Sequence, residues 1–214
     1  MCGKRSRGGR AGGRAGAIHT PSRRRGSASD PEAVILLRAD EVGRLAYARL
    51  ARDHAIAPLT PGTARPIDVP DSPGLRALAA APRVPGHVVL TGLAALWVHG
   101  WLTAPPLAWH AVGLRGLYRP PGALVMLHSG VTARLGIRTP SGLALAPPPR
   151  ACVDALRWED PGDALPAAVR GLREGRIVPA DLLAALACDP ANGAGFARLD
   201  SLVRAVVGAA TPQK

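Results

Sequence analysis

The side chains that could do acid–base or metal chemistry are widely separated in this sequence. None of the six histidines forms an HExxH or HxH pattern or lies at helical spacing from a carboxylate. His99 and His110 are eleven residues apart, and His128 falls on a different expected strand. His99 ends an apolar helical stretch just before Gly100, which is typical of a hydrogen-bonded histidine at a helix end. The histidines therefore predict no metal site and no metal catalysis.

Nucleophile and nucleotide signatures are missing from the sequence too. There is no GxSxG turn, no phosphate-binding loop and no dinucleotide fingerprint. The three cysteines, Cys2, Cys152 and Cys188, have no CxxC or Cys/His ligand spacing, so we expect free thiols rather than a disulfide framework or a zinc module. Cys152 leaves two readings open: a thiol activated by Arg150 and a helix N-terminus, or a small core residue, which is the commoner role.

The acidic residues predict structural roles rather than a catalytic pair. Asp154 lies between apolar neighbours on an expected helix, so it needs a cationic partner, and Arg150 or Arg157 is within about a turn. Three more acids surround Pro161-Gly162, where we expect carboxylates to cap the next helix and face solvent. These are Glu159, Asp160 and Asp163.

The elements that must position these side chains alternate between short strands and helices, which predicts an α+β fold. We expect a small mixed sheet packed by helices, a helical C-terminal part and a disordered basic N-terminal tail. The expected strands are His87–Leu90, Trp109–Val112, Leu124–His128 and one around Ile137 and Arg138, which precedes a turn at Ser141-Gly142 and the residues Leu143–Leu145. The expected helices begin at Asp30, Leu75, Thr91 (as N-cap), Cys152, Ala164, Asp181 and Phe196.

Composition shifts divide the chain into three expected segments. Residues 1–30 are a low-complexity tail that we expect to be disordered. Residues 31–86 hold one helix that ends before Pro58 and a proline-rich stretch in which 67–69 could form a short edge strand, together a possible degenerate remnant of a winged helix. Residues 87–210 form the expected α+β domain.

Charge is the most distinctive feature of the composition. The chain of 214 residues has a formal net charge of +12, and eight basic residues without any acid fall within 1–25. This leader could be an arm that contacts phosphates without regard to sequence, or simply a solvated basic tail. No apolar run is long enough to span a membrane and no secretory apolar segment follows the leader, so we expect a cytoplasmic protein with no membrane partner.

Three blocks of sequence make the stretch 87–207 resemble the AbiEi family of antitoxins from type IV toxin–antitoxin systems. The first is VLTGLAALWVHG at 89–100, similar to a capped helix that ends in His-Gly. The second is the strand pair WHAV at 109–112 and LVMLH at 124–128. The third runs from LGIRTP at 135–140 to PRACVDAL at 149–156, similar to a short strand, a proline break and an Asp-bearing helix.

The resemblance implies a non-enzymatic transcriptional regulator that binds DNA, represses its own operon and neutralises a toxin protein. It implies no cofactor and no metal. The family's DNA-reading winged helix would fall within 31–86. Our candidate phosphate contacts are arginines of the leader and of the first expected helix: Arg23, Arg24, Arg25, Arg38, Arg44, Arg49 and Arg52.

Two other function classes remain open at this point. A protein-interaction module without specific nucleic-acid binding would expose a large apolar patch. A divergent nuclease-type enzyme would need carboxylates clustered for metal ions, such as Asp154 and a second acid converging on a cleft.

Overall fold

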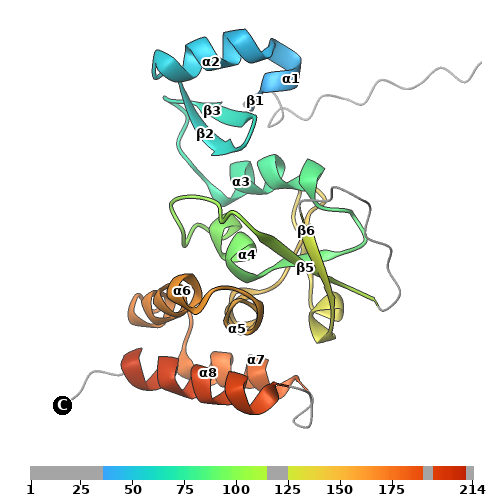
Figure 1. Ribbon diagram of the computed structural model, residues 1–214, viewed down its shortest axis with the longest axis vertical. Helices are drawn as coiled ribbons and strands as arrows, with labels where there is room; N and C mark the ends of the chain where they lie inside the picture. Colours follow the sequence, from blue (N-terminus) through green and yellow to red (C-terminus); the bar gives the residue numbers. More distant parts are fainter. Residues whose placement is uncertain (1–35, 115–124, 190–194, 211–214) are drawn as a thin grey trace, which may run out of the picture.

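The computed structural model describes residues 36–114, 125–189 and 195–210, and its fold is α+β, as the sequence predicts. The elements stack in layers along the long axis of the molecule, with α2 at one end and α7 and α8 at the other (Figure 1). Residues 1–35, which include the expected tail, lie outside the described residues. No helix among the described residues is long and apolar enough to cross a membrane.

The N-terminal unit is a small antiparallel sheet beneath two helices (Figure 1). It contains β1 (Leu37–Arg38), α1 (Ala39–Val42), α2 (Arg44–Arg52), β2 (Ile56–Thr60) and β3 (Thr63–Pro66). The strand order is β1-β3-β2, because the hairpin turn at Pro61-Gly62 brings β3 back to pair with β1. Gly62 lies at φ +78, a conformation that glycine adopts without strain.

The sequence-based prediction for this unit was wrong in two respects. A single helix up to Pro58 does not form, because Gly43, at φ +85, separates α1 from α2, and residues 37–38 pair with β3 instead. The proline-rich stretch contains a hairpin, and 67–69 is a turn rather than an edge strand. Pro58 is tolerated because β2 is an edge strand, and Pro66 is the last residue of β3.

A second sheet of five strands carries the rest of the molecule. Its strands are β4 (Val89–Thr91), β5 (Trp109–Gly113), β6 (Val125–Ser129), β7 (Ile137–Arg138) and β8 (Ala144–Leu145), in the order β6-β5-β4-β8-β7. The sheet is mixed: β5–β6 and β4–β8 are parallel, and the other two pairs are antiparallel. The four predicted strands are therefore present as β4 to β7, within about two residues of their expected bounds, and β8 follows the expected turn at Ser141-Gly142.

Helices cover the second sheet and form the C-terminal layers (Figure 1). They are α3 (Pro73–Ala80), α4 (Gly92–Val98), α5 (Pro148–Trp158), α6 (Pro161–Arg173), α7 (Pro179–Ala187) and α8 (Phe196–Ala210), with short 3-10 turns η2 (Ala81–Arg83) and η3 (Val131–Arg134). Every residue of α4 is buried, and this helix packs on α5. Helix α5 begins four residues before the expected Cys152, because proline fits the first turn of a helix.

One apolar core joins the two units. Leu36 and Leu59 of the N-terminal unit belong to the same buried cluster as Leu75 of α3. The guanidinium of Arg83 also donates to the carbonyl of Pro61 at the hairpin tip. The N-terminal unit is therefore held against α3 by both apolar and polar contacts.

Candidate nucleic-acid interface and buried polar centre

Helix α2 presents arginines on its outer face. Arg44, Arg49 and Arg52 are exposed, whereas Tyr47 and Leu50 are half-buried on the side facing the sheet. At about 100° per residue, the three arginines fall within an arc of about 140°. The sequence places Arg38 on the same expected helix; the structure brings only Arg44, Arg49 and Arg52 together on one helix surface.

These three arginines are free of intramolecular partners among the described residues. No hydrogen bond or ion pair joins Arg44, Arg49 or Arg52 to another described side chain or carbonyl, and the last turn of α2 carries two of them. Positively charged arginines at a helix C-terminus interact favourably with the helix dipole. Their guanidinium groups remain available for an external anion.

Arg38 differs from the other candidates in position and partner. It is in β1, not on the helix, and it pairs with Glu41 at 3.6 Å. Together with Arg44 and Arg83 it lines a cavity of about 610 Å³ between the α1–α2 turn and α3. Arg23, Arg24 and Arg25 lie outside the described residues.

Asp154 is the centre of a buried polar network. Its Oδ2 accepts hydrogen bonds from the hydroxyls of Thr91 and Thr132, both at 2.7 Å, and its Oδ1 accepts from Nε of Arg150 at 3.0 Å. The residue is completely buried. The predicted pairing with Arg150 is confirmed, and both carboxylate oxygens are occupied by protein groups.

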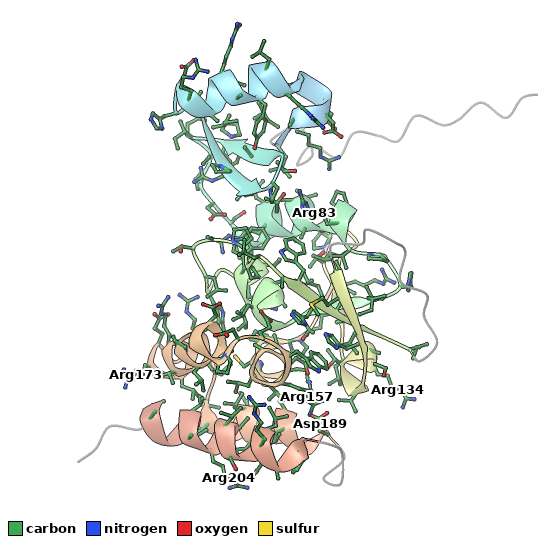
Figure 2. The ribbon with its side chains drawn as sticks, in the orientation of Figure 1. Arg83, Arg134, Arg157, Arg173, Asp189 and Arg204 are labelled. Carbon is green, nitrogen blue, oxygen red and sulfur yellow. The ribbon has the colours of Figure 1, made fainter. Side chains whose placement is uncertain are left out.

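Arg150 extends this network to α7. It donates to Asp189 at 2.7 Å, and Asp189 also pairs with Arg157 at 2.8 Å (Figure 2). Burial alone would lower the pKa of Arg150, but the hydrogen bonds and charges of Asp154 and Asp189 outweigh burial and raise it. Two arginines therefore balance two aspartates, which is the condition under which buried charges are tolerated.

Thr91 does not use its side chain as the expected helix cap. It occupies the N-cap position of α4, but its hydroxyl makes no capping bond and donates to Asp154 instead. The backbone N–H of Leu93 donates to the Glu159 carboxylate at 2.5 Å. A side chain distant in sequence thus supplies the cap.

Glu159 also departs from the expectation that the acids near Pro161 face solvent. Burial raises the pKa of Glu159 to about 7, and the hydrogen bond from Leu93 only partly offsets this. Asp160 does behave as expected, since it caps α6 by accepting from the N–H of Gly162. Gly92 makes room for Glu159: a Cβ there would lie 2.0 Å from the Glu159 Oε1.

Two histidines that the sequence separates come together on the parallel strands β5 and β6. Nδ1 of His110 and Nε2 of His128 are 2.8 Å apart, and Trp158 stacks on His128 at a centroid distance of 3.9 Å. Burial and the charge of His128 lower the pKa of His110 to about 4, and burial lowers that of His128. One neutral ring therefore donates to the other.

The surroundings of the remaining candidate residues, His99 and Cys152, favour structural roles for both. Nε2 of His99 lies 3.0 Å from the carbonyl of Ala146, consistent with the hydrogen-bonded helix-end histidine expected from the sequence. Cys152 is buried, which raises its pKa to about 12, so the core reading of this thiol is favoured over the reactive one. Within the described ranges, no three His, Cys, Asp or Glu residues are grouped so as to hold a metal ion.

Comparisons with known proteins add little beyond this geometry. No family model matches the chain, and no curated protein matches it. Among solved structures, the chain is similar to the RV2827C protein from Mycobacterium tuberculosis, with 15% sequence identity, coverage of 84% of this chain and 78% of that one, and a TM-score of 0.38.

Proposed function

We propose that this chain is an antitoxin-like, non-enzymatic transcriptional regulator of the AbiEi type, which binds DNA through its N-terminal unit and acts in the cytoplasm. The observation that carries the proposal is the order of elements in that unit. A strand, two helices joined by a tight turn and an antiparallel hairpin follow one another, and the returning strand pairs with the first. In a winged-helix domain a strand, a helix-turn-helix and a hairpin follow a first helix in this order, and the second helix of the helix-turn-helix enters the major groove.

The dimensions and surface of α2 suit that role. With its side chains an α-helix is about 10–12 Å in diameter, and the major groove, about 12 Å wide, admits one. Ala48 and Leu45, both exposed, lie on the same arc as the arginines. Arg44, Arg49 and Arg52 can each contact a phosphate or the O6/N7 edge of a guanine.

Neutralisation of a toxin protein rests on the sequence resemblance alone. The three blocks that carry it form β4–α4, β5–β6 and β7–α5, so they belong to the part of the molecule away from α2. We therefore assign toxin binding to the 87–210 region and DNA binding to the N-terminal unit.

Asp154 gives no support to the nuclease alternative. A metal-dependent nuclease would need this carboxylate to open onto a cleft with a second acid. Asp154 is completely buried, and Arg150, Thr91 and Thr132 occupy its two oxygens.

A protein-interaction module without specific DNA binding is the second candidate. Large apolar side chains on the surface favour it, among them Leu107, Ile137 and Met126. This alternative predicts the same affinity for any DNA of a given length and salt concentration.

Fluorescence anisotropy of labelled DNA tests the proposal. The full chain is titrated against DNA from the region upstream of its own gene and against a scrambled duplex, across a salt series. We expect tighter binding to the upstream DNA, with the preference retained as salt rises, because base contacts depend less on counterion release than phosphate contacts do. Equal affinity for both duplexes at every salt concentration would reject the proposal.

A further inference from the structure

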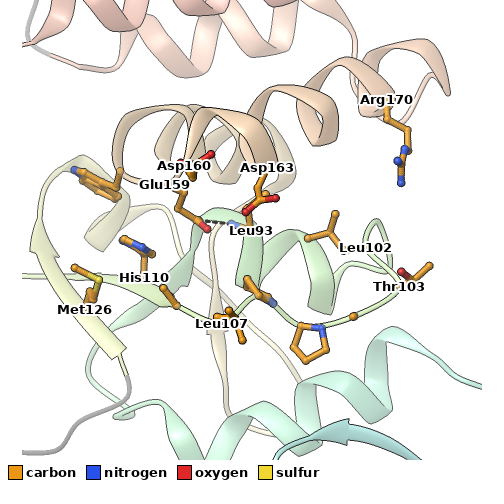
Figure 3. Close-up of a pocket in the computed structure, with 15 residues that line it drawn as sticks. Leu93, Leu102, Thr103, Leu107, His110, Met126, Glu159, Asp160, Asp163 and Arg170 are labelled. Carbon is orange, nitrogen blue, oxygen red and sulfur yellow. Dashed lines mark hydrogen bonds between the residues drawn. The ribbon is translucent and has the colours of Figure 1, made fainter.

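A cavity of about 570 Å³ lies between the segment 102–108, strands β5 and β6, and the start of α6 (Figure 3). This volume is in the range of small-molecule sites. Its walls are largely apolar, with Leu93, Leu102, Pro105, Leu107 and Met126 among the lining residues. None of the contacts described above for DNA binding involves this cavity.

Two of the apolar side chains in the cavity are left in solvent by the fold. Leu107 is 106% exposed and Met126 is 42% exposed. Figure 3 shows both on the side of the cavity opposite the acidic residues of α6. A ligand that covered Leu107 and Met126 would gain the burial that the chain itself does not provide.

The opposite side of the cavity is acidic. Glu159, Asp160 and Asp163 line it, within a chain whose formal net charge is +12. The Asp163 carboxylate has no hydrogen-bond or ion-pair partner among the described residues, whereas its backbone N–H donates to the carbonyl of Asp160. Arg170 also lines the cavity, but it lies two turns further along α6, about 10 Å along the axis, so it does not pair with Asp163 (Figure 3).

We propose that this cavity binds a small organic cation: an ammonium or guanidinium group attached to an apolar body. The cationic group lies against Asp163 and its neighbouring carboxylates, and the apolar body covers Leu107 and Met126. Nucleic acid is disfavoured at this site, because the carboxylates of Asp160 and Asp163 would repel its phosphates. The site is independent of the DNA-binding role of α2.

Three probes with the same body and different head groups test the site on the full chain. Hexylammonium, hexanol and hexanoate are titrated by ligand-observed NMR. Because the protein as a whole is strongly basic, general electrostatics favours hexanoate. We expect the reverse order, with hexylammonium binding at least tenfold more tightly than hexanoate and more tightly than hexanol.

Variants locate the binding within the cavity. Asp163→Asn should weaken hexylammonium about threefold and leave hexanol unchanged, since an exposed charge pair contributes a few tenths to 1 kcal/mol. Leu107→Gln should weaken both probes. The matched controls are Asp181→Asn, in the first turn of α7, and Leu114→Gln, an exposed leucine outside the cavity; neither should change binding.

The proposal is overturned by either of two outcomes. Hexylammonium that binds no more tightly than hexanol would show that the carboxylates do not select a cation. Binding that Asp163→Asn and Leu107→Gln leave at the level of their controls would place the cation elsewhere on the protein.

Discussion

The outer face of α2 and the centre around Asp154 use charged side chains in opposite ways. In the centre, each of the four charges has a partner of opposite sign: Asp154, Asp189, Arg150 and Arg157. On α2, three exposed arginines have no partner among the described residues. The buried charges hold β4, η3, α5 and α7 together, whereas those of α2 hold no other described element in place. Partnering therefore distinguishes the structural arginines of the buried centre from the exposed arginines of α2.

Substitution of the central aspartate should give the largest loss of stability. Asp154→Ala removes the acceptor for Arg150, Thr91 and Thr132 and leaves a buried guanidinium with one carboxylate fewer. We expect the free energy of unfolding to fall by about 3–5 kcal/mol, as is typical when one partner of a buried ion pair is removed. Urea denaturation measures this loss.

The matched control for that experiment is an exposed pair on α8. Asp200→Ala breaks a salt bridge to Arg204 of the same i,i+4 spacing as Arg150–Asp154, in which the Arg204 side chain is 67% exposed. It should cost less than about 1 kcal/mol. Similar losses for the two variants would contradict the structural role assigned to the buried network.

Gly92 should be the most sensitive glycine near the acidic side of the cavity. Gly92→Ala places a Cβ against the Glu159 carboxylate at a residue with φ +64. We expect a loss of about 2 kcal/mol, from backbone strain together with displacement of the α4 cap. Gly142→Ala, at φ +81 with no atom near its Cβ position, isolates the strain and should cost about 1 kcal/mol in the same denaturation assay. Equal losses would show that the close approach to Glu159 is unimportant.

The smallest expected effect is the change in the free energy of unfolding with pH that arises from the Glu159 carboxyl. Its pKa is raised from the ordinary 4.5 to about 7 in the folded protein, so the folded state binds the proton more tightly than the unfolded chain does. The stabilisation that this protonation provides is lost as pH rises through 7. Glu159→Gln keeps an acceptor for the N–H of Leu93 without a charge.

The difference in the free energy of unfolding between the parent and Glu159→Gln, followed against pH, separates the contribution of Glu159 from that of the histidines. Between about pH 5.5 and 8, we expect the stability of the parent to fall relative to the variant by about 1 kcal/mol, the partial exposure of Glu159 limiting the effect. Parallel denaturation curves across this range would show that Glu159 keeps an ordinary pKa.

Local sequence signals predicted the parts of the molecule that depend on near neighbours. The α+β class, four of the five strands of the second sheet and the Arg150–Asp154 pair all follow from hydrophobic patterns or from spacing within one helix. The burial of Cys152 follows from its apolar neighbours in the same way.

Features that depend on which strands or helices become neighbours could not be read from the sequence. His110 and His128 meet only because β5 and β6 are parallel, with His110 opposite Met126 and therefore on the same face as His128. Glu159 turns inward because the N-terminus of α4 lies beside it. In the N-terminal unit, the many prolines argued against strands, and the hairpin was not predicted. A strand can contain Pro58 only because β2 lies at the edge of its sheet, and the sequence does not show which strand is at the edge.

The most direct test of the central claim compares two triple variants in DNA binding. Arg44→Gln, Arg49→Gln and Arg52→Gln are combined in one protein; Arg134→Gln, Arg170→Gln and Arg198→Gln are combined in the other, so both lose three exposed positive charges. We expect the α2 variant to lose about 100-fold in affinity for the upstream DNA and its preference over scrambled DNA, at about 1 kcal/mol or slightly less per arginine, with unchanged stability. The other variant should keep the preference. Equal losses in the two proteins would contradict the assignment of DNA binding to α2.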